Sequence, residues 1–135
     1  MRRIDHTAVA VRDLTEAVPR YEGLLGGRAG ERIVMADQGV EVAFVSMGDT
    51  QLELVQPLDP TSGVARFLDT HGEGLHHVGV AVDDLSAELR RLEADGVRLI
   101  DRVPRRGVHG LIAFIHPHGT GGVLVELVQH EAWLP

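Results

Sequence analysis

Apolar and polar positions follow one plan twice along the chain. In the first half, residues 6–11 alternate as in a strand, and residues 12–27 have helical spacing. Two further alternating stretches follow at 39–47 and 50–57. In the second half, the same succession occupies residues 77–82, 83–96, 110–117 and 121–129. Alternation with a period of two is typical of strands, and spacing of three to four residues is typical of an amphipathic helix. We therefore predict a strand, a helix and about three strands in each half.

The ends of the first predicted helix carry residues with special backbone roles. Asp13 is of a type that caps helix N-termini, and Gly26–Gly27 ends the helical pattern. Pro19 lies inside this helix, where a proline removes a backbone donor and is expected to kink the axis. Residues 59–74, between the two halves, predict a short connecting helix because their apolar positions share one face.

The two halves also repeat in their letters. The nonapeptides HTAVAVRDL and HVGVAVDDL begin at His6 and at His77, 71 positions later. Such self-similarity indicates an internal repeat. We predict a single domain over residues 1–135, made of module one at about 1–58, a connecting helix at about 60–71 and module two at about 74–131.

Strand geometry predicts where the two histidines point. His6 shares one strand face with Ala8 and Ala10, whereas the valines of this stretch share the opposite face. His77 likewise shares its face with two small residues, Gly79 and Ala81. We expect the valines to pack beneath the helices and the small residues to leave an open pocket beside each histidine.

A second repeated signal is a glutamate inside an apolar strand. Glu53 lies in LELVQ, and Glu126 lies in VELVQ 73 positions later. A carboxylate among apolar neighbours is costly to bury unless it is paired, hydrogen-bonded or bound to a metal. Together with His6 and His77 the two glutamates form a His2Glu2 set, which suits a divalent first-row metal and leaves two open positions in an octahedral geometry.

Composition and charge narrow the classes of protein. The chain has 135 residues, 44% hydrophobic and 24% charged, which is ordinary for one globular domain with no membrane span. The N-terminus lacks the continuous apolar run of a signal peptide, so we expect a cytoplasmic protein. With no cysteine, any metal site depends on His, Asp, Glu or Gln. A net charge of −7 argues against a broad nucleic-acid surface.

Simpler interpretations of these residues stay open. A single strand histidine is more often a satisfied core or surface imidazole than a metal ligand, and a lone strand glutamate usually faces solvent. Duplication alone also copies residues that have no function. The metal-site hypothesis therefore rests on the joint pattern of corresponding positions, matching faces and small neighbours.

Several segments together resemble a known family. They are IDHTAVAVRDL, QGVEVAFVSMGDTQLELVQPL, GEGLHHVGVAVDDL, GVRLID and HPHGTGGVLVELVQ. The likeness covers nearly the whole chain and is to the methylmalonyl-CoA epimerases of the vicinal oxygen chelate superfamily, which includes glyoxalase I. The resemblance implies an α+β fold, with two βαβββ modules forming a cupped mixed sheet around a divalent metal, and a homodimer. It implies the ligands His6, Glu53, His77 and Glu126.

The resemblance also implies a reaction and a substrate. The substrate would be an acyl-CoA, methylmalonyl-CoA, whose C2 proton is removed to give an enolate chelated to the metal and is returned on the opposite side. Cobalt is the first expectation for the metal, with manganese, nickel, zinc and magnesium as alternatives. Glu126 and Glu41 are the acid/base candidates. Further pocket candidates are Gln38, Gln51 and His109, and Arg105 and Arg106 are candidates for binding phosphate. His76 is expected to be structural. His118 stands where the family often has lysine.

Two other functions compete with the epimerase. One is another metal-dependent lyase or isomerase of the glyoxalase type, acting on a different dioxygen substrate. The other is a metal-free small-molecule-binding module, in which the four ligand residues would be relics.

Overall fold

The chain divides into two compact units in the computed structural model, which describes residues 2–131. The N-terminal unit is His6–His76, and the C-terminal unit is Met1–Asp5 together with His77–Pro135. Two strands, β1 (Arg3–Ala10) and β5 (Gly74–Ala81), each begin in one unit and continue into the other.

The N-terminal unit contains a four-stranded mixed sheet and two helices. Its elements after β1 are α1 (Leu14–Leu25), β2 (Ile33–Met35), the 3-10 helix η1 (Ala36–Gln38), β3 (Val40–Met47), β4 (Thr50–Pro57) and α2 (Gly63–His71). The strand order is β2-β3-β4-β1. Strand β1 runs parallel to β4, and the other neighbouring pairs are antiparallel.

The C-terminal unit repeats this arrangement. Its elements after β5 are α3 (Leu85–Ala94), β6 (Arg105–Arg106), β7 (Gly110–Ile115), the 3-10 helix η2 (Pro117–Gly119) and β8 (Val125–His130). The strand order is β5-β8-β7-β6, with β5 parallel to β8. Each unit therefore has the predicted succession of strand, helix and three strands. The hydrophobic pattern did not locate the short edge strands β2 and β6.

The predicted helix boundaries agree with the structure. The Asp13 side chain accepts a hydrogen bond from the Thr15 N–H at 2.8 Å and so caps α1. The helix ends at Gly26, whose φ of 76° is a left-handed conformation that glycine adopts without strain. Pro19 lies within α1, and the helix continues through it to Leu25.

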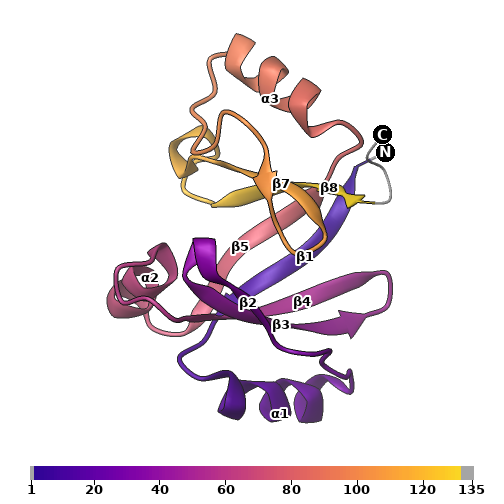
Figure 1. Ribbon diagram of the computed structural model, residues 1–135, viewed down its shortest axis with the longest axis vertical. Coiled ribbons are helices and arrows are strands. Elements are labelled where there is room, and N and C mark those ends of the chain that lie inside the picture. The colour runs from indigo at the N-terminus through magenta and orange to yellow at the C-terminus, as the bar shows by residue number, and fades with distance from the viewer. Residues whose placement is uncertain (1, 132–135) are drawn as a thin grey trace. The chain divides into compact units, whose positions relative to one another are not determined.

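Each sheet has one face packed against a helix, which we call its helix face (Figure 1). Helix α1 contacts β3 and β4, and α3 contacts β7 and β8. Leu14 and Leu85, the first residues of the two helices, are fully buried in these cores. Burial of one such leucine contributes about 1.5–3 kcal/mol. The prediction that the strand valines pack beneath the helices is confirmed for Val9, Val11 and Val82.

A repeated glutamine fixes the start of each helix to its sheet. The Gln56 side-chain oxygen accepts a hydrogen bond from the Leu14 N–H, and the Gln129 side-chain oxygen accepts one from the Leu85 N–H, both at 2.8 Å. The first N–H groups of a helix have no partner within the helix, so a side-chain acceptor is needed there when the helix end is buried. The letters LVQ occur in both halves, but their repetition alone does not reveal this role of the glutamines.

The predicted connecting helix is α2, which is part of the N-terminal unit. The Ser62 hydroxyl caps it by accepting from the Ala65 N–H at 3.1 Å. Val64 and Leu68 are buried, and the helix contacts β4. Within residues 2–131, every helix is too short or too polar to cross a membrane.

Candidate active site

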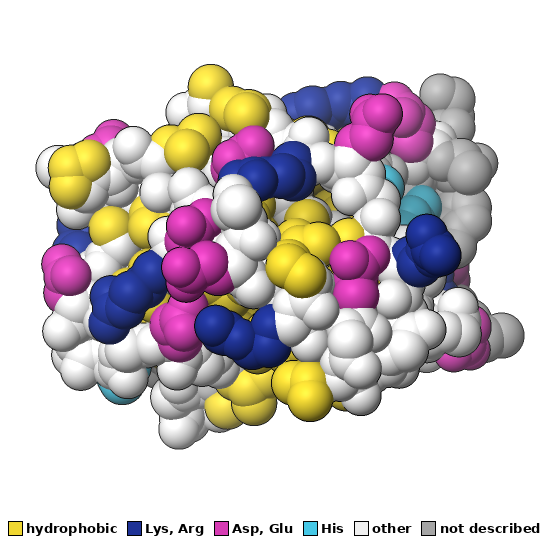
Figure 2. Space-filling view, turned by 90° about the horizontal axis from the view of Figure 1, so that it is seen from below, with side chains coloured by type: hydrophobic (Ala, Val, Ile, Leu, Met, Phe, Trp, Pro, Cys, Tyr) yellow, Lys and Arg dark blue, Asp and Glu magenta, His cyan; other side chains and the backbone are white. Residues whose placement is uncertain are grey.

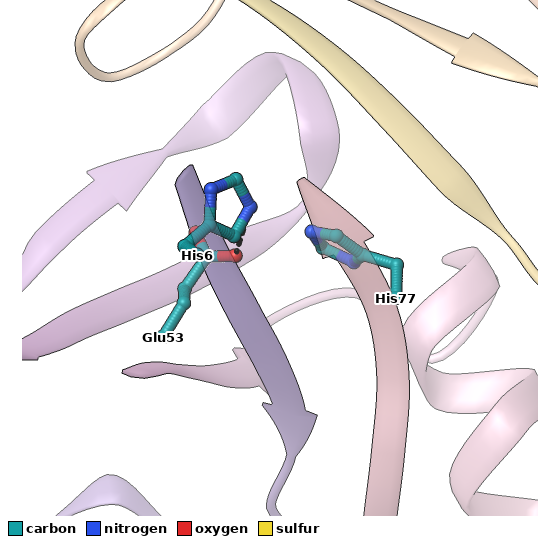
Figure 3. A group of neighbouring side chains, drawn as sticks. All are labelled: His6, Glu53 and His77. Atoms are coloured by element: carbon teal, nitrogen blue, oxygen red, sulfur yellow. Dashed lines mark ion pairs between the residues drawn. The ribbon is translucent and has the colours of Figure 1, made fainter. Parts of the chain in front are cut away.

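In the N-terminal unit, β1 and β4 bring His6 and Glu53 to the sheet face opposite the helix, which we call the histidine face. In the parallel register His6 lies beside Gln51 and Ala8 beside Glu53. His6 is 4% exposed and Glu53 is 9% exposed. The His6 Nε2 lies 3.6 Å from the Glu53 Oε1, as the dashed line in Figure 3 marks. An imidazole and a carboxylate are thus buried next to each other.

Phe44 of β3 completes this arrangement. It pairs with Glu53 across the β3–β4 ladder. Its ring meets the His6 ring edge-on, with the ring centroids 6.3 Å apart and the planes at 89°. An edge-to-face contact restricts rotation of the imidazole and keeps water from one side of it.

The C-terminal unit presents the same three residue types on its histidine face. His77 of β5 and Glu126 of β8 are each 7% exposed, and Glu126 pairs with Gly79 in the parallel register. Phe114 of β7 pairs with Glu126 across the antiparallel ladder. The Phe114 and His77 rings lie edge-on, with centroids 5.4 Å apart and planes at 88°. Each unit therefore holds what we call a His–Phe–Glu set.

The two phenylalanines are site residues that sequence reasoning missed. The signal was present, because Ala-Phe occurs at Ala43–Phe44 and again at Ala113–Phe114, in corresponding strands. The strand register shows that both lie next to the repeated glutamates.

His6, Glu53 and His77 are also the group that fits a metal ion among the described residues. Each offers one ligand atom, and these atoms all lie within 4.8 Å of one another (Figure 3). First-row metals bind imidazole nitrogen and carboxylate oxygen at about 2.0–2.2 Å, so the donor set and its spacing suit one divalent ion. Glu126, the fourth predicted ligand, does not belong to this group of described residues.

The small residues beside the histidines differ from expectation. Ala8, Ala10 and Ala81 are 0% exposed, so solvent does not reach them. The prediction of an open pocket bordered by these residues is therefore wrong.

Glu41 lies on the helix face of β3. Side chains alternate along this strand, and Ala43 and Val45 pack in the core with α1, so Glu41 shares their face. Its carboxylate pairs with Arg32 at 3.2 Å, and Arg32 also donates to the Thr15 hydroxyl at the start of α1. Glu41 was predicted as an acid/base group, but its strand position separates it from the face of His6 and Glu53. We therefore leave it out of the site.

The predicted pocket residues have different positions. Gln51 is half-buried and lies on the histidine face, in register with His6. Gln38 is the last residue of η1. His109 precedes β7, and its ring stacks on that of His130 with centroids 6.1 Å apart. Of the three candidates, the strand register places only Gln51 beside a predicted ligand.

Two further histidines have structural neighbours. His76 packs its ring edge-on against Phe67 of α2 at 5.1 Å, which agrees with the structural role expected for it. His118, in η2, lies with its Nδ1 3.3 Å from an Arg98 nitrogen. Desolvation and the positive charges of Arg98 and His118 lower the pKa of His116, so its neutral form is favoured near neutral pH.

Charges of both signs are mixed on the face drawn in Figure 2, where acidic, basic and apolar side chains lie interspersed. Several of the exposed charged side chains of helices and loops form ion pairs with a neighbour of opposite charge. Arg20 pairs with Glu73 at 3.9 Å, and Arg91 pairs with Glu88 at 2.9 Å. Such exposed pairs contribute little to stability, about 0–1 kcal/mol each.

Comparison with known proteins agrees with this geometry. Residues 5–115 match the model of the Glyoxalase/Bleomycin resistance protein/Dioxygenase superfamily. A relative from Bacillus subtilis, "Uncharacterized protein YqjC", is 43% identical over 96% of this chain and 93% of its own. The mitochondrial methylmalonyl-CoA epimerase of Bos taurus is 40% identical, over 94% of this chain and 74% of its own.

A solved structure gives the same result. The structure described as "Methylmalonyl-CoA epimerase in complex with methylmalonyl-CoA and NH4+" is 34% identical, with a TM-score of 0.93 over 98% of this chain and 96% of its own. The glyoxalase-like fold class is therefore confirmed. The chain belongs to the glyoxalase superfamily and, within it, to the methylmalonyl-CoA epimerase family.

Proposed function

We propose that this protein catalyses the metal-dependent epimerisation of methylmalonyl-CoA at C2. The observation that carries the proposal is the duplicated His–Phe–Glu set, buried in a chain that belongs to an epimerase family. The resemblance to glyoxalase-type lyases is more distant than the resemblance to the epimerases. The substrate is the one that a close structural relative is described as binding.

The proposed metal ligands are His6, Glu53, His77 and Glu126. Three of them already form a compact group of suitable donors, and Glu126 is the counterpart of Glu53 in the second set. A bound divalent ion would supply Lewis-acid stabilisation of the charge that develops on the thioester oxygen, an effect of several kcal/mol. Cobalt is our first choice, with manganese, nickel, zinc and magnesium as alternatives, since these ligand types do not select one ion.

Two carboxylates would move the proton. On the described strands, the histidine face carries one carboxylate in each unit, Glu53 and Glu126. Epimerisation needs a group that removes the C2 proton on one side and a group that returns a proton on the other. We assign these roles to Glu126, as the sequence predicted, and to Glu53 in place of Glu41. A positioned base contributes about 100- to 10,000-fold to the rate.

The remaining residues of the two sets would hold the carboxylates and imidazoles in place. Phe44 and Phe114 restrict the histidine rings, and their apolar surface excludes water from the proton-transfer groups.

The test is exchange of the C2 proton of methylmalonyl-CoA in D2O, with the purified protein stripped of metal and then resupplied with Co2+. We expect deuterium incorporation that requires the metal, together with interconversion of the two epimers. Exchange without interconversion would show a different isomerase or lyase chemistry. If the protein binds stoichiometric metal but exchanges no proton, another dioxygen substrate would be tested next. If the protein neither binds metal nor exchanges the proton, a metal-free binding module would be favoured.

We also propose that residues 1–135 act as one vicinal oxygen chelate domain, as a homodimer in the cytoplasm. The family resemblance supports the dimer, and the lack of cysteine is compatible with a reducing compartment. Sedimentation equilibrium of the purified chain tests the dimer, for which twice the chain mass of 14.7 kDa is expected.

A further inference from the structure

We propose that Arg105 binds an anionic group of the acyl-CoA substrate, and that Arg106 does not. The inference rests on the proposed function for the identity of the ligand. It depends on how a two-residue strand, β6, turns two adjacent arginines to opposite faces of the C-terminal sheet.

Arg105 lies on the histidine face. It pairs with Ile112 in the antiparallel register, and Ile112 shares its face with Phe114, two residues further along β7. The contact agrees with the register, because the Arg105 guanidinium carbon lies 5.7 Å from the centre of the Phe114 ring. A guanidinium over an aromatic face is attracted to the ring, which favours this position of the side chain.

Asp101 forms an ion pair with the Nε edge of the Arg105 guanidinium. The Arg105 Nε lies 3.1 Å from the Asp101 Oδ1, and the second oxygen of Asp101 accepts a hydrogen bond from the Phe114 N–H at 2.8 Å. The Nε atom is itself buried and has no hydrogen bond of good geometry among the described residues. One carboxylate therefore ties the arginine to the backbone of the residue on which it stacks.

The terminal nitrogens of Arg105 are available to a ligand. A guanidinium has five N–H donors, and Asp101 faces only the Nε edge. No ion pair or hydrogen bond to another described residue occupies the terminal nitrogens. The side chain is 38% exposed, so a ligand can reach it. Two parallel N–H donors match the two oxygens of a carboxylate or a phosphate.

The position of Arg105 connects it to the reacting groups. The Phe114 ring lies beneath the Arg105 guanidinium and nearly perpendicular to the His77 ring, and Phe114 pairs with Glu126 across the β7–β8 ladder. A single phenylalanine thus separates the arginine from the metal-ligand candidates of the same unit. Methylmalonyl-CoA has oxyanions of two kinds, the free carboxylate next to C2 and the phosphates of the coenzyme.

Arg106 provides the matched control. It pairs with Leu111, which packs with the core of the helix face, and its guanidinium forms an ion pair with the exposed Glu131. It has the same charge and lies one residue away, but on the opposite face. The two arginines therefore separate the effect of position from the effect of net charge.

The experiment measures binding by calorimetry for the wild type, Arg105→Gln, Arg105→Lys and Arg106→Gln. The probes are methylmalonyl-CoA, propionyl-CoA, coenzyme A and methylmalonyl-pantetheine. We expect Arg105→Gln to weaken methylmalonyl-CoA binding by about 10- to 100-fold, the loss typical of a charge-assisted pair of hydrogen bonds. Arg105→Lys keeps the charge without the fork and should lie between, and Arg106→Gln should change binding less than about twofold.

The probes distinguish the two anions. If Arg105 binds the carboxylate, Arg105→Gln weakens methylmalonyl-pantetheine and leaves coenzyme A and propionyl-CoA unchanged. If it binds a phosphate, the three coenzyme A compounds weaken and methylmalonyl-pantetheine does not. Unchanged binding of all four probes overturns the proposal, as does an equal loss in Arg106→Gln. If Arg105→Gln has a lowered Tm, its loss of binding can reflect misfolding, and the affinity of Arg105→Lys is used instead. Wild-type affinity in Arg105→Lys would contradict a contact through two parallel N–H donors.

Failure of the proposed function would look different. Wild-type protein that binds these probes through Arg105 but exchanges no C2 proton would retain the binding site and exclude the epimerase. Wild-type protein that exchanges the C2 proton, with Arg105→Gln unchanged in binding and in KM, would retain the epimerase and exclude the role of Arg105.

Discussion

The two units have the same residue types in their His–Phe–Glu sets and different residues beside these sets. Each has a His–Phe–Glu set and a glutamine that accepts from the first N–H of the following helix. The strand position that carries Arg105 in the C-terminal unit carries Ile33 in the N-terminal unit, where Ile33 pairs with Val42. The nearby Arg32 pairs with Glu41 of the helix face instead.

This difference separates the residue types that occur in both units from those that occur in one unit only. The proposed metal ligands and the helix anchors have counterparts in both units. Under the proposed function, one anionic group of the substrate needs a positive charge at one place only. The C-terminal unit has the arginine on its histidine face, and the N-terminal unit has an apolar residue at the same place, which agrees with one anion contact.

The largest effect is expected when one histidine of the two sets is removed. His6→Ala and His77→Ala should each lose bound Co2+ and reduce C2 exchange by about 1,000-fold or more, because several kcal/mol of charge stabilisation depend on the ion. Metal analysis by mass spectrometry and the D2O assay measure the two losses. His76→Ala is the control, since His76 packs against Phe67 and should keep both metal and exchange. Full metal content in His77→Ala would contradict the shared site.

The second prediction separates the two glutamates by stereochemistry. Glu53→Gln and Glu126→Gln keep an oxygen ligand but lose a proton-transfer group. Each variant should lose exchange by about 100- to 10,000-fold with one epimer and keep it with the other, and the two variants should be opposite. Proton NMR of each pure epimer in D2O measures this. If both variants slow both epimers equally while retaining metal, the two carboxylates serve only as ligands.

Sequence reasoning reached the repeat, the element order and the buried His and Glu residues because these follow from periodicity. Alternation in a strand predicts which sheet face a residue occupies, and a repeated residue predicts corresponding positions in the two halves. The same rule, applied to Glu41, would have placed it with Ala43 and Val45 on the helix face.

Other features depend on which strand lies next to which. Phe44 and Phe114 have no visible role until the register pairs them with Glu53 and Glu126. The different directions of Arg105 and Arg106 also require the short strand β6, which the hydrophobic pattern did not show. The burial of Ala8 and Ala10 depends on tertiary packing, which composition does not encode locally.

The third prediction compares the two helix anchors through stability. Gln129→Leu removes the acceptor for a buried N–H, whereas Gln56→Leu removes one for a half-buried N–H. A buried donor left without a partner costs about 1–3 kcal/mol, so Gln129→Leu should lower the free energy of unfolding by that amount and Gln56→Leu by less. Urea unfolding monitored by circular dichroism measures both. Equal losses of unfolding free energy in the two variants would contradict the prediction, because they would show that water does not replace the Gln56 acceptor at the Leu14 N–H.

The fourth prediction concerns the two phenylalanines. Phe44→Leu and Phe114→Leu keep apolar volume but remove the edge-to-face contact with a histidine, worth about 0.5–1.5 kcal/mol. Metal affinity should fall by about two- to tenfold in both. Only Phe114→Leu should also weaken methylmalonyl-CoA binding, because Arg105 then loses the ring beneath it. Competition with a metal-sensitive dye and calorimetry measure the two affinities, and an equal loss of substrate affinity in Phe44→Leu would contradict the asymmetry.

The smallest effect is expected at Glu41. Its partner Arg32 is 39% exposed, and a pair of this kind contributes about 0–1 kcal/mol, so Glu41→Gln should lower the free energy of unfolding by no more than that. C2 exchange of both epimers should stay within about twofold of the wild-type rate, because the strand turns this carboxylate toward α1. The same D2O assay measures it, with Glu53→Gln as the reference for loss. A decrease of 100-fold, a size about typical of a lost general base, would return Glu41 to the catalytic pair and require β3 to present a different face.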